Sequence, residues 1–244
     1  MKGQNEADDP RRRLLVQALT AGVFSGASLG ASAQVRGGFF GSQPARLPPE
    51  QSIFRLQGGA TVNGSNATLQ TRIGPSDTVE TSRDGEIVFV VGANSFILRG
   101  GSKLELSARQ QDSAILSGLR MLTGKLLSVT RNNSLQFTTT TATVGIRGTG
   151  VYLEADPAET YFCTCYGVAD VVANDDPESR DTVAATHHDR PLYIVAGQDR
   201  GRNIRPAGFR NHTDQELMLI ETLVGRTPPF VFPGGAYSAP RREY

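Results

Sequence analysis

The sequence predicts an all-β protein: a roll, a sandwich or a short solenoid-like arrangement of short strands, with one short C-terminal helix and an extended tail. From Ile53 onward, short runs rich in Val, Ile, Leu, Phe and Thr recur about every 8–12 residues. Gly, Asn and Asp separate these runs, and these residue types favour turns. Glycine makes up 27 of the 244 residues and Trp is absent, which argues against a long helical bundle.

The first 33 residues have the pattern of a cleaved export signal. Three arginines at positions 11–13 precede an apolar segment, and Ala31-Ser32-Ala33 is the small-residue pattern that signal peptidase reads. Two arginines, one further residue and two leucines resemble the twin-arginine motif, although Pro10 stands where Ser or Thr is usual. Two alternatives remain: export through the general secretory route, and a segment that is not cleaved and anchors the protein in the membrane. We expect a periplasmic or secreted protein that begins at Gln34 and has no stable membrane span.

The mature chain divides into four expected parts. Residues 34–50 form a linker, residues 51–172 a β domain, residues 173–227 a C-terminal extension with a Cys/His-associated loop and a helix, and residues 228–244 a flexible tail. The expected strands of the β domain are 60–63, 67–73, 86–91, 95–99, 103–107, 125–131, 135–144, 150–154 and 160–172.

Local signals define the turns and helices. Asn63-Gly64 and Asp84-Gly85 predict hairpin turns, because these residue types tolerate positive φ. The apolar spacing within residues 113–123 predicts a short helix. Residues 174–182 are acidic and predict an exposed loop. Thr213-Asp214-Gln215-Glu216 fits a capping box and predicts a helix that ends near Gly225.

Segments of the β domain resemble, in order, the FecR domain of bacterial extracytoplasmic proteins. The segments are 56–64, 77–85, 102–106, 124–127 and 137–139, followed by Val144-Gly145-Ile146-Arg147-Gly148-Thr149-Gly150-Val151-Tyr152. The resemblance covers about half of the chain, residues 53–172, and implies an all-β, periplasmic, non-enzymatic module. Family members that regulate a sigma factor have a long cytoplasmic region before a membrane helix. Only ten residues precede the arginines here, so we do not expect anti-sigma activity.

The charge balance and the absence of known motifs argue against nucleic-acid binding, catalysis and phosphate binding. Lys and Arg number 25 and Asp and Glu 24, so the chain lacks the basic excess of nucleic-acid binders, and we expect no such partner. Catalytic motifs such as G-x-S-x-G and H-E-x-x-H are absent, and we expect no enzyme activity. The glycine run 145–150 lacks the Lys and the helix of a phosphate loop, so we expect a tight bend between strands there.

Both cysteines lie in one predicted strand, two residues apart. Cys163 and Cys165 therefore point to the same face of the sheet. Their Cβ atoms would be roughly 6–7 Å apart, beyond the range of about 3.5–4.5 Å that a disulfide requires. Two thiolates on one face are better placed to share a Zn or Cu(I) ion.

All three histidines follow the cysteines, and two of them would complete a four-coordinate site. Neighbouring residues on a strand point in opposite directions, so we expect only one of His187 and His188 to contribute. The predicted metal ligands are Cys163, Cys165, His188 and His212, with His187 as the alternate. The spacing matches no standard zinc finger, and two readings stay open: buried structural cysteines, and a redox-active or disulfide pair.

Two functions follow from these observations. The first is an exported, non-catalytic FecR-like module that binds or senses an unknown protein partner in the envelope. The second is a periplasmic protein that binds Zn or Cu, or acts in thiol redox chemistry, through the Cys163/Cys165 pair and histidines.

Overall fold

The computed structural model describes residues 45–109, 112–130, 134–197 and 200–230. The predicted export signal, most of the predicted linker 34–50 and most of the predicted tail 228–244 lie outside these residues.

Strands account for most of the described chain, and a single helix follows them. The strands are β1 (Ile53–Gln57), β2 (Ala60–Val62), β3 (Ser65–Asn66), β4 (Thr78–Thr81), β5 (Glu86–Val91), β6 (Asn94–Leu98), β7 (Lys103–Arg109), β8 (Asp112–Val129), β9 (Ser134–Thr138), β10 (Ala142–Ala155), β11 (Glu159–Ala173), β12 (Asp176–Ala185), β13 (Leu192–Val195) and β14 (Ile204–Pro206). The helix is α2 (Asp214–Leu223). The all-β class with a short C-terminal helix is confirmed.

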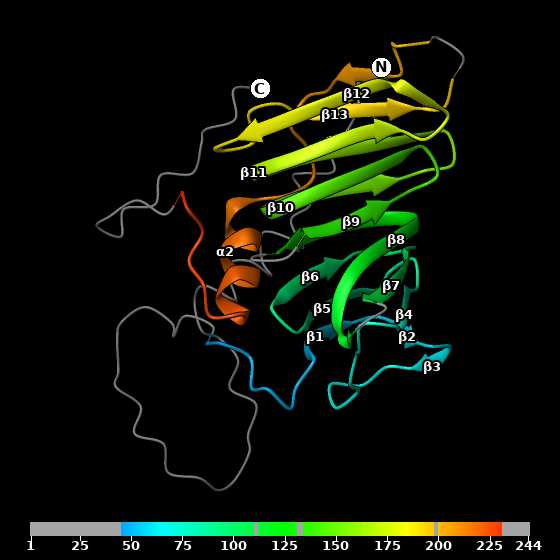
Figure 1. Ribbon diagram of the computed structural model, residues 1–244. Coiled ribbons are helices and arrows are strands. Elements are labelled where there is room, and N and C mark those ends of the chain that lie inside the picture. Colours follow the sequence, from blue (N-terminus) through cyan, green and yellow to red (C-terminus); the bar gives the residue numbers. More distant parts are fainter. Residues whose placement is uncertain (1–44, 110–111, 131–133, 198–199, 231–244) are drawn as a thin grey trace, which may run out of the picture.

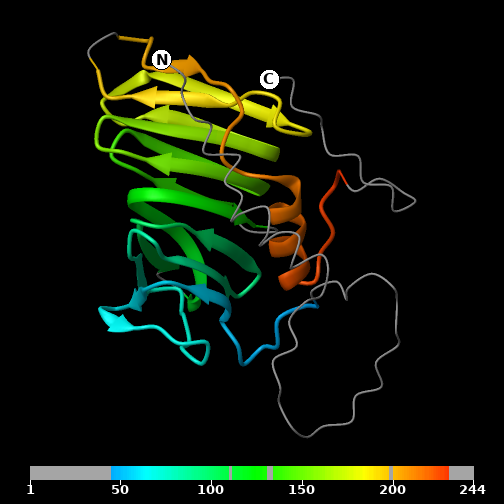
Figure 2. The ribbon, with the colours of Figure 1, turned by 180° about the vertical axis from the view of Figure 1, so that it is seen from behind.

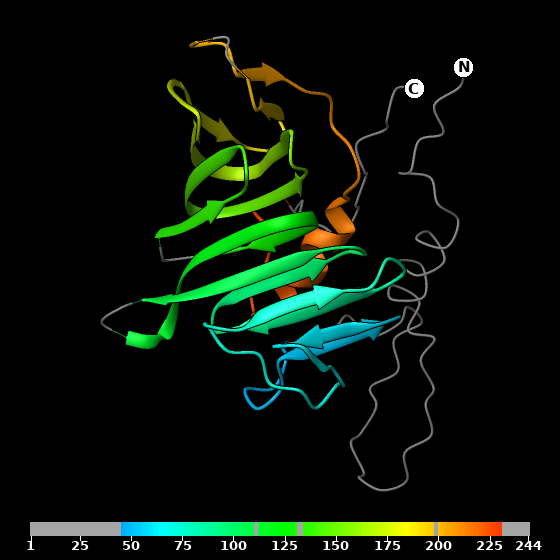
Figure 3. The same cartoon turned by 90° about the vertical axis from the view of Figure 1, so that its right-hand side faces the viewer.

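The strands form one sheet with the order β14-β13-β11-β10-β9-β8-β7-β4-β2-β3 along its main path. Strands β1, β5, β6 and β12 join it through side branches. In Figure 1 the strands are stacked from β1–β4 at one end to β12 and β13 at the other, with α2 beside them. The reverse view and the side view show the same arrangement, with the sheet curled and α2 on one side (Figures 2 and 3).

The sheet continues past residue 172 into the C-terminal extension. Strand β12 pairs with β11 from Gly167↔Ala185 onward, and β13 pairs with the first four residues of β11, from Glu159↔Val195 to Phe162↔Leu192. Strand β14 then pairs with β13. Strands β12, β13 and β14 of the extension thus form part of the same sheet, and the chain leaves the sheet after β14.

Two apolar cores lie on opposite sides of the sheet. Alternate residues of a strand belong to different cores: Leu126 and Leu153 belong to the larger one, Leu127 and Tyr152 to the smaller one. The smaller core contains the apolar face of α2, namely Leu217, Leu219, Ile220 and Leu223. It also contains both cysteines, so the predicted site lies in the layer between the sheet and the helix.

The prediction of a helix at 113–123 is wrong, because this segment belongs to β8. Strand β7 pairs with it from Lys103↔Thr123 to Arg109↔Asp112. The pairing moves from Gly118 opposite Ser107 to Leu116 opposite Ala108, so one residue is skipped. This bulge brings Leu116 and Leu119, three residues apart, into the same core and imitates the apolar spacing of a helix.

Three further local predictions need correction. Residues 67–73 form an irregular segment in place of the expected strand, with a turn at 69–70 closed by the Thr71 amide, which donates to the Thr68 carbonyl at 3.0 Å. Most of the expected acidic loop 174–182 belongs to β12, whose cross-strand partners on β11 were not recognisable from local composition. The turn at Asp84-Gly85 does not form a hairpin, because β4 and β5 pair with other strands.

The Asn63-Gly64 hairpin and the C-terminal helix are confirmed. Asn63 and Gly64 have φ values of 51° and 79° and connect β2 to β3. Thr213 and Glu216 form the expected capping box, and Gly225 has a φ of 72° just after the helix. No helix in the described ranges is both long and apolar enough to cross a membrane.

The glycine run 145–150 lies inside β10, so the expected bend between two strands is wrong. The pairing with β11 is irregular between Arg147 and Val151, which marks a bulge. A Cβ at Gly150 would lie 2.4 Å from the Tyr166 ring. Glycine is required there because the ring occupies the space of a side chain.

Candidate metal site

Strand β11 holds both cysteines on the face that α2 covers. Cys163 and Cys165 alternate with Phe162 and Thr164, and both thiols are fully buried. Both cysteines are free, and the Cys165 Sγ lies 3.9 Å from the Cys163 carbonyl oxygen. The prediction that the two side chains share one face is confirmed, because both belong to the core under α2.

The connection between β12 and β13 positions His188. Its backbone amide donates to the Cys165 carbonyl at 3.0 Å, and its φ is 54°, in the left-handed region. The Asp189 carboxylate accepts from the Thr186 amide at 2.6 Å and its hydroxyl at 2.9 Å, which fixes the turn. His188 therefore sits in a turn and not in a strand. Non-glycine residues in this conformation cost energy and are concentrated at functional sites.

The segment between β14 and α2 positions His212, and several contacts fasten it to the sheet. Tyr161 donates its hydroxyl to the Gly208 carbonyl at 3.1 Å. The Arg210 guanidinium lies 4.6 Å from the centre of the Tyr161 ring and pairs with Glu154 at 2.8 Å. The His212 ring stacks on Tyr152 with centroids 4.5 Å apart. His212 is 1% exposed, so its ring is as buried as the cysteines.

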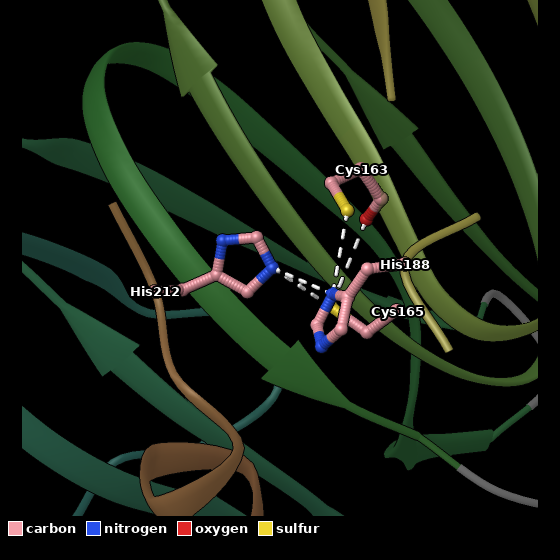
Figure 4. A group of neighbouring side chains, drawn as sticks. All are labelled: Cys163, Cys165, His188 and His212. Atoms are coloured by element: carbon pink, nitrogen blue, oxygen red, sulfur yellow. Dashed lines mark hydrogen bonds between the residues drawn. The ribbon is translucent and has the colours of Figure 1, made fainter. Parts of the chain in front are cut away.

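These elements bring the four predicted ligands together. All four donor atoms lie within 4.8 Å of one another. Cys163 Sγ lies 3.6 Å from His188 Nδ1, Cys165 Sγ lies 3.4 Å from His212 Nε2, and the two ring nitrogens are 3.1 Å apart. Figure 4 shows the four side chains pointing toward one another, from β11, the turn at His188 and the segment before α2.

Three of the six separations between the donor atoms are close to the edges of a tetrahedron around Zn²⁺. Zn–S bonds of about 2.3 Å and Zn–N bonds of about 2.0 Å give tetrahedral edges of about 3.3 Å for N–N and about 3.5 Å for S–N. The N–N distance of 3.1 Å and the S–N distances of 3.4 and 3.6 Å are close to these values. These three distances suit an ion bound by two cysteines and two histidines, and the other donor separations are at most 4.8 Å.

The second nitrogen of each histidine ring already has a hydrogen-bond acceptor. His212 Nδ1 lies 2.7 Å from the Arg210 carbonyl, and His188 Nε2 lies 3.0 Å from Asp214 Oδ1. A carbonyl and a carboxylate only accept, so these nitrogens carry the protons. The lone pairs of His188 Nδ1 and His212 Nε2 then face each other, which is unfavourable unless a cation or a proton lies between them.

The pKa shifts make the two thiols unequal. The neighbouring Cys165 thiol, together with His188 and His212, lowers the pKa of Cys163 despite its burial. Burial and the nearby Cys163 raise the pKa of Cys165. Burial lowers the pKa of His212; burial also acts to lower that of His188, but Asp214 and Cys163 outweigh it and raise the His188 pKa. Cys163 is therefore predisposed to be a thiolate, the form that binds metal.

His187 does not join the four donors and contacts Asp214 instead. Its Nε2 lies 2.9 Å from both carboxylate oxygens. Asp214 is the first residue of α2 and is 4% exposed, at the helix end that stabilises negative charge. Sequence reasoning missed Asp214 as part of the site. Its position two residues after His212 was the signal available, but the residue was assigned only to the capping box.

Comparison with known proteins leaves the function to be argued from these residues. No protein-family model and no curated protein matches the chain. Two crystal structures described as a "putative anti-sigma factor from Parabacteroides distasonis ATCC 8503" match it with 13% and 14% identity and a TM-score of 0.42. Each match covers 55% of this chain, which spans 60% of the other. The resemblance to the FecR domain stays a prediction.

Proposed function

We propose that this protein binds one transition-metal ion, Zn²⁺ foremost and Cu(I) as the alternative, through Cys163, Cys165, His188 and His212. The observation that carries the proposal is the arrangement of four buried donors in which each histidine turns one ring nitrogen toward the other donors and contacts an acceptor with its second nitrogen. Such outer contacts to the second ring nitrogen are typical of metal-binding histidines. A buried pair of structural cysteines would need neither histidine.

The ion in this proposal is structural and not catalytic. Four protein donors complete a tetrahedral shell, whereas catalytic zinc sites keep a position open for water or substrate. The ion would connect β11, the turn at His188 and the segment before α2. We therefore propose a non-catalytic binding or sensing module whose C-terminal extension is fastened by metal, with an unknown protein partner in the envelope.

Metal analysis tests the proposal directly. We expect about one Zn or Cu per chain in the purified protein, two free thiols after denaturation, and no metal in the double variant Cys163→Ser/Cys165→Ser. At a free metal concentration of about 1,000 Kd, the lost stabilisation is about 4 kcal/mol. For a chain of this size that lowers the Tm by about 8–16 °C. Absence of metal from the wild-type protein and from protein refolded with Zn²⁺ would contradict the site.

Thr164 provides a matched control for the cysteine substitutions. It lies between the two cysteines on β11, is fully buried, and its hydroxyl has no hydrogen-bond partner among the described residues. Thr164→Val keeps the shape and removes that hydroxyl, so metal content and Tm should stay at wild-type values or the Tm should rise. Equal losses in Thr164→Val and the cysteine variant would assign the effect to core packing.

We also propose that the protein is exported through the twin-arginine route, which transports folded proteins. Replacing Arg11 and Arg12 by Lys should retain the precursor inside the cell, whereas Arg13→Lys, at the variable position of the motif, should not. Cell fractionation with intact-mass analysis measures this, and the exported form should begin at Gln34. Undiminished export of the Arg11→Lys/Arg12→Lys variant would indicate the general secretory route.

A further inference from the structure

The four buried donors raise the question of how an ion reaches them. Cys163, Cys165 and His212 are at most 1% exposed, and the His188 side chain is 7% exposed. The His187 side chain, in contrast, is 32% exposed. Among the described Cys and His side chains, His187 is therefore the one that solvent reaches readily.

His187 connects to the buried site through one carboxylate. Both Asp214 oxygens lie 2.9 Å from His187 Nε2, and Asp214 Oδ1 lies 3.0 Å from His188 Nε2. The donor atoms of these three residues lie within 4.8 Å of one another, as in the buried group. The two groups share the His188 ring, with Nε2 facing the outer group and Nδ1 facing the thiols.

Aromatic side chains line all three histidines, and Phe230 packs against the His187 ring with centroids 5.0 Å apart. Phe209 packs against the His188 and His212 rings, with centroids 4.6 and 4.5 Å apart. Tyr152 stacks on His212 at 4.5 Å. These rings offer an incoming ion no donor, whereas the side of His187 and Asp214 offers an imidazole and a carboxylate.

We propose that His187 and Asp214 form an outer, transient metal site through which the ion passes on its way to and from the Cys₂His₂ site. The inference rests on the proposed function, because it needs a buried metal site to serve. An aquated divalent cation would exchange water for an Asp214 oxygen and for His187 Nε2, after the proton that Nε2 shares with Asp214 has moved to Nδ1 through solvent. It would then exchange these ligands for the thiolates and the two inner ring nitrogens. Each thiol that becomes a ligand releases its proton to solvent.

The chemistry of the two groups favours movement inward. The outer group offers one carboxylate and one imidazole from His187. The inner group offers two thiolates, which bind Zn²⁺, Co²⁺ and Cu(I) more tightly than a carboxylate does. The positive end of α2 lies at Asp214 and disfavours a cation that stays there. The outer group is therefore suited to brief occupation.

The test is the rate of metal release from the purified full-length protein loaded with Co²⁺. Thiolate-bound Co²⁺ absorbs through sulfur-to-metal charge transfer, so the signal reports the inner site and not the outer one. Holoprotein is mixed with excess EDTA, and the first-order loss of absorbance is followed. His187→Ala should slow release about tenfold, a barrier change of about 1.4 kcal/mol, and slow loading by the same factor. Its Kd for Co²⁺ should stay within about twofold of the wild-type value.

Two further variants separate the roles of His187. His187→Gln keeps a donor for Asp214 but loses the imidazole ligand, so it should be as slow as His187→Ala; wild-type rates would show that His187 only positions Asp214. Phe209→Ala opens the other side and should change release less than about threefold. If Phe209→Ala released the metal faster while His187→Ala released it at the wild-type rate, the ion would leave the buried site past Phe209.

The outcomes also separate this inference from the proposed function. Wild-type protein that gives no charge-transfer absorbance with Co²⁺ would overturn both. A bound ion with unchanged kinetics in His187→Ala would overturn the outer site and leave the Cys₂His₂ proposal in place. A weakened Kd in His187→Ala, without slower release, would give His187 a positioning role and overturn its role in metal passage.

Discussion

Removing the proposed metal ion should make the amides of residues 207–216 exchange with solvent about a hundredfold faster, while the sheet stays protected. His212 is adjacent to the cap residue Thr213, so loss of the ion releases the first turn of α2 from β11. A hundredfold increase in the exchange rate corresponds to a decrease of about 3 kcal/mol in the free energy of local unfolding. Hydrogen exchange followed by mass spectrometry, with and without a chelator, measures the change.

The later part of α2 should respond less than its first turn. Leu217, Ile220 and Leu223 are at most 1% exposed, and each contributes about 1.5–3 kcal/mol through burial. The Cys163→Ser/Cys165→Ser variant is the control, because it should exchange rapidly with or without the chelator. Equal protection of residues 207–216 in metal-bound and metal-free wild type would show that the ion does not fasten this segment.

Arg99→Met should destabilise the protein by about 2–4 kcal/mol. The Arg99 side chain is 3% exposed and pairs with Glu216 of α2 at 2.7 Å. Its guanidinium also donates to the Tyr152 hydroxyl at 3.3 Å and to the Asn211 carbonyl. Loss of one partner of a buried ion pair costs about 3–5 kcal/mol, and Glu216 remains 15% exposed, which reduces the cost. Urea unfolding gives the free energy.

Arg120→Met is the matched control for this substitution. Arg120 pairs with Glu105 at 3.3 Å, but the two side chains are 61% and 34% exposed. Such pairs contribute about 0–1 kcal/mol. Equal effects at Arg99 and Arg120 would contradict a structural role for the buried pair. A double-mutant cycle of Arg99→Met with Glu216→Gln should show coupling, since the two residues share one contact.

The part of the site that follows simple geometric rules could be predicted from the sequence. A strand alternates its side chains, so Cys163 and Cys165 had to share a face if β11 was regular. The helix beginning after Thr213 followed from its capping box. The choice of His188 over His187 agrees with the donor group, but the reason differs: His188 lies in a left-handed turn, so strand alternation does not govern it.

Features that depend on partners distant in the sequence could not be predicted. The 113–123 segment has the apolar spacing of a helix, and only its pairing with β7, with a bulge at Ser117, makes it a strand. The acidic residues of β12 lie in a strand because β11 supplies hydrogen-bond partners. Asp214 contacts His187 and His188, which lie 27 and 26 residues before it in the chain, and no local pattern indicates these contacts.

The order of the four proposed ligands along the chain would give a bound ion the role of a cross-link. Residues 165, 188 and 212 enclose two consecutive loops of more than twenty residues each. Closing a loop of this length in the unfolded chain removes conformational entropy worth about 3 kcal/mol in the loop-closure model used for disulfides. Small exported domains commonly obtain this restraint on the unfolded chain from disulfide bonds. Here the same restraint would depend on the supply of metal, so a chelator would open it under any redox condition that leaves the thiols intact.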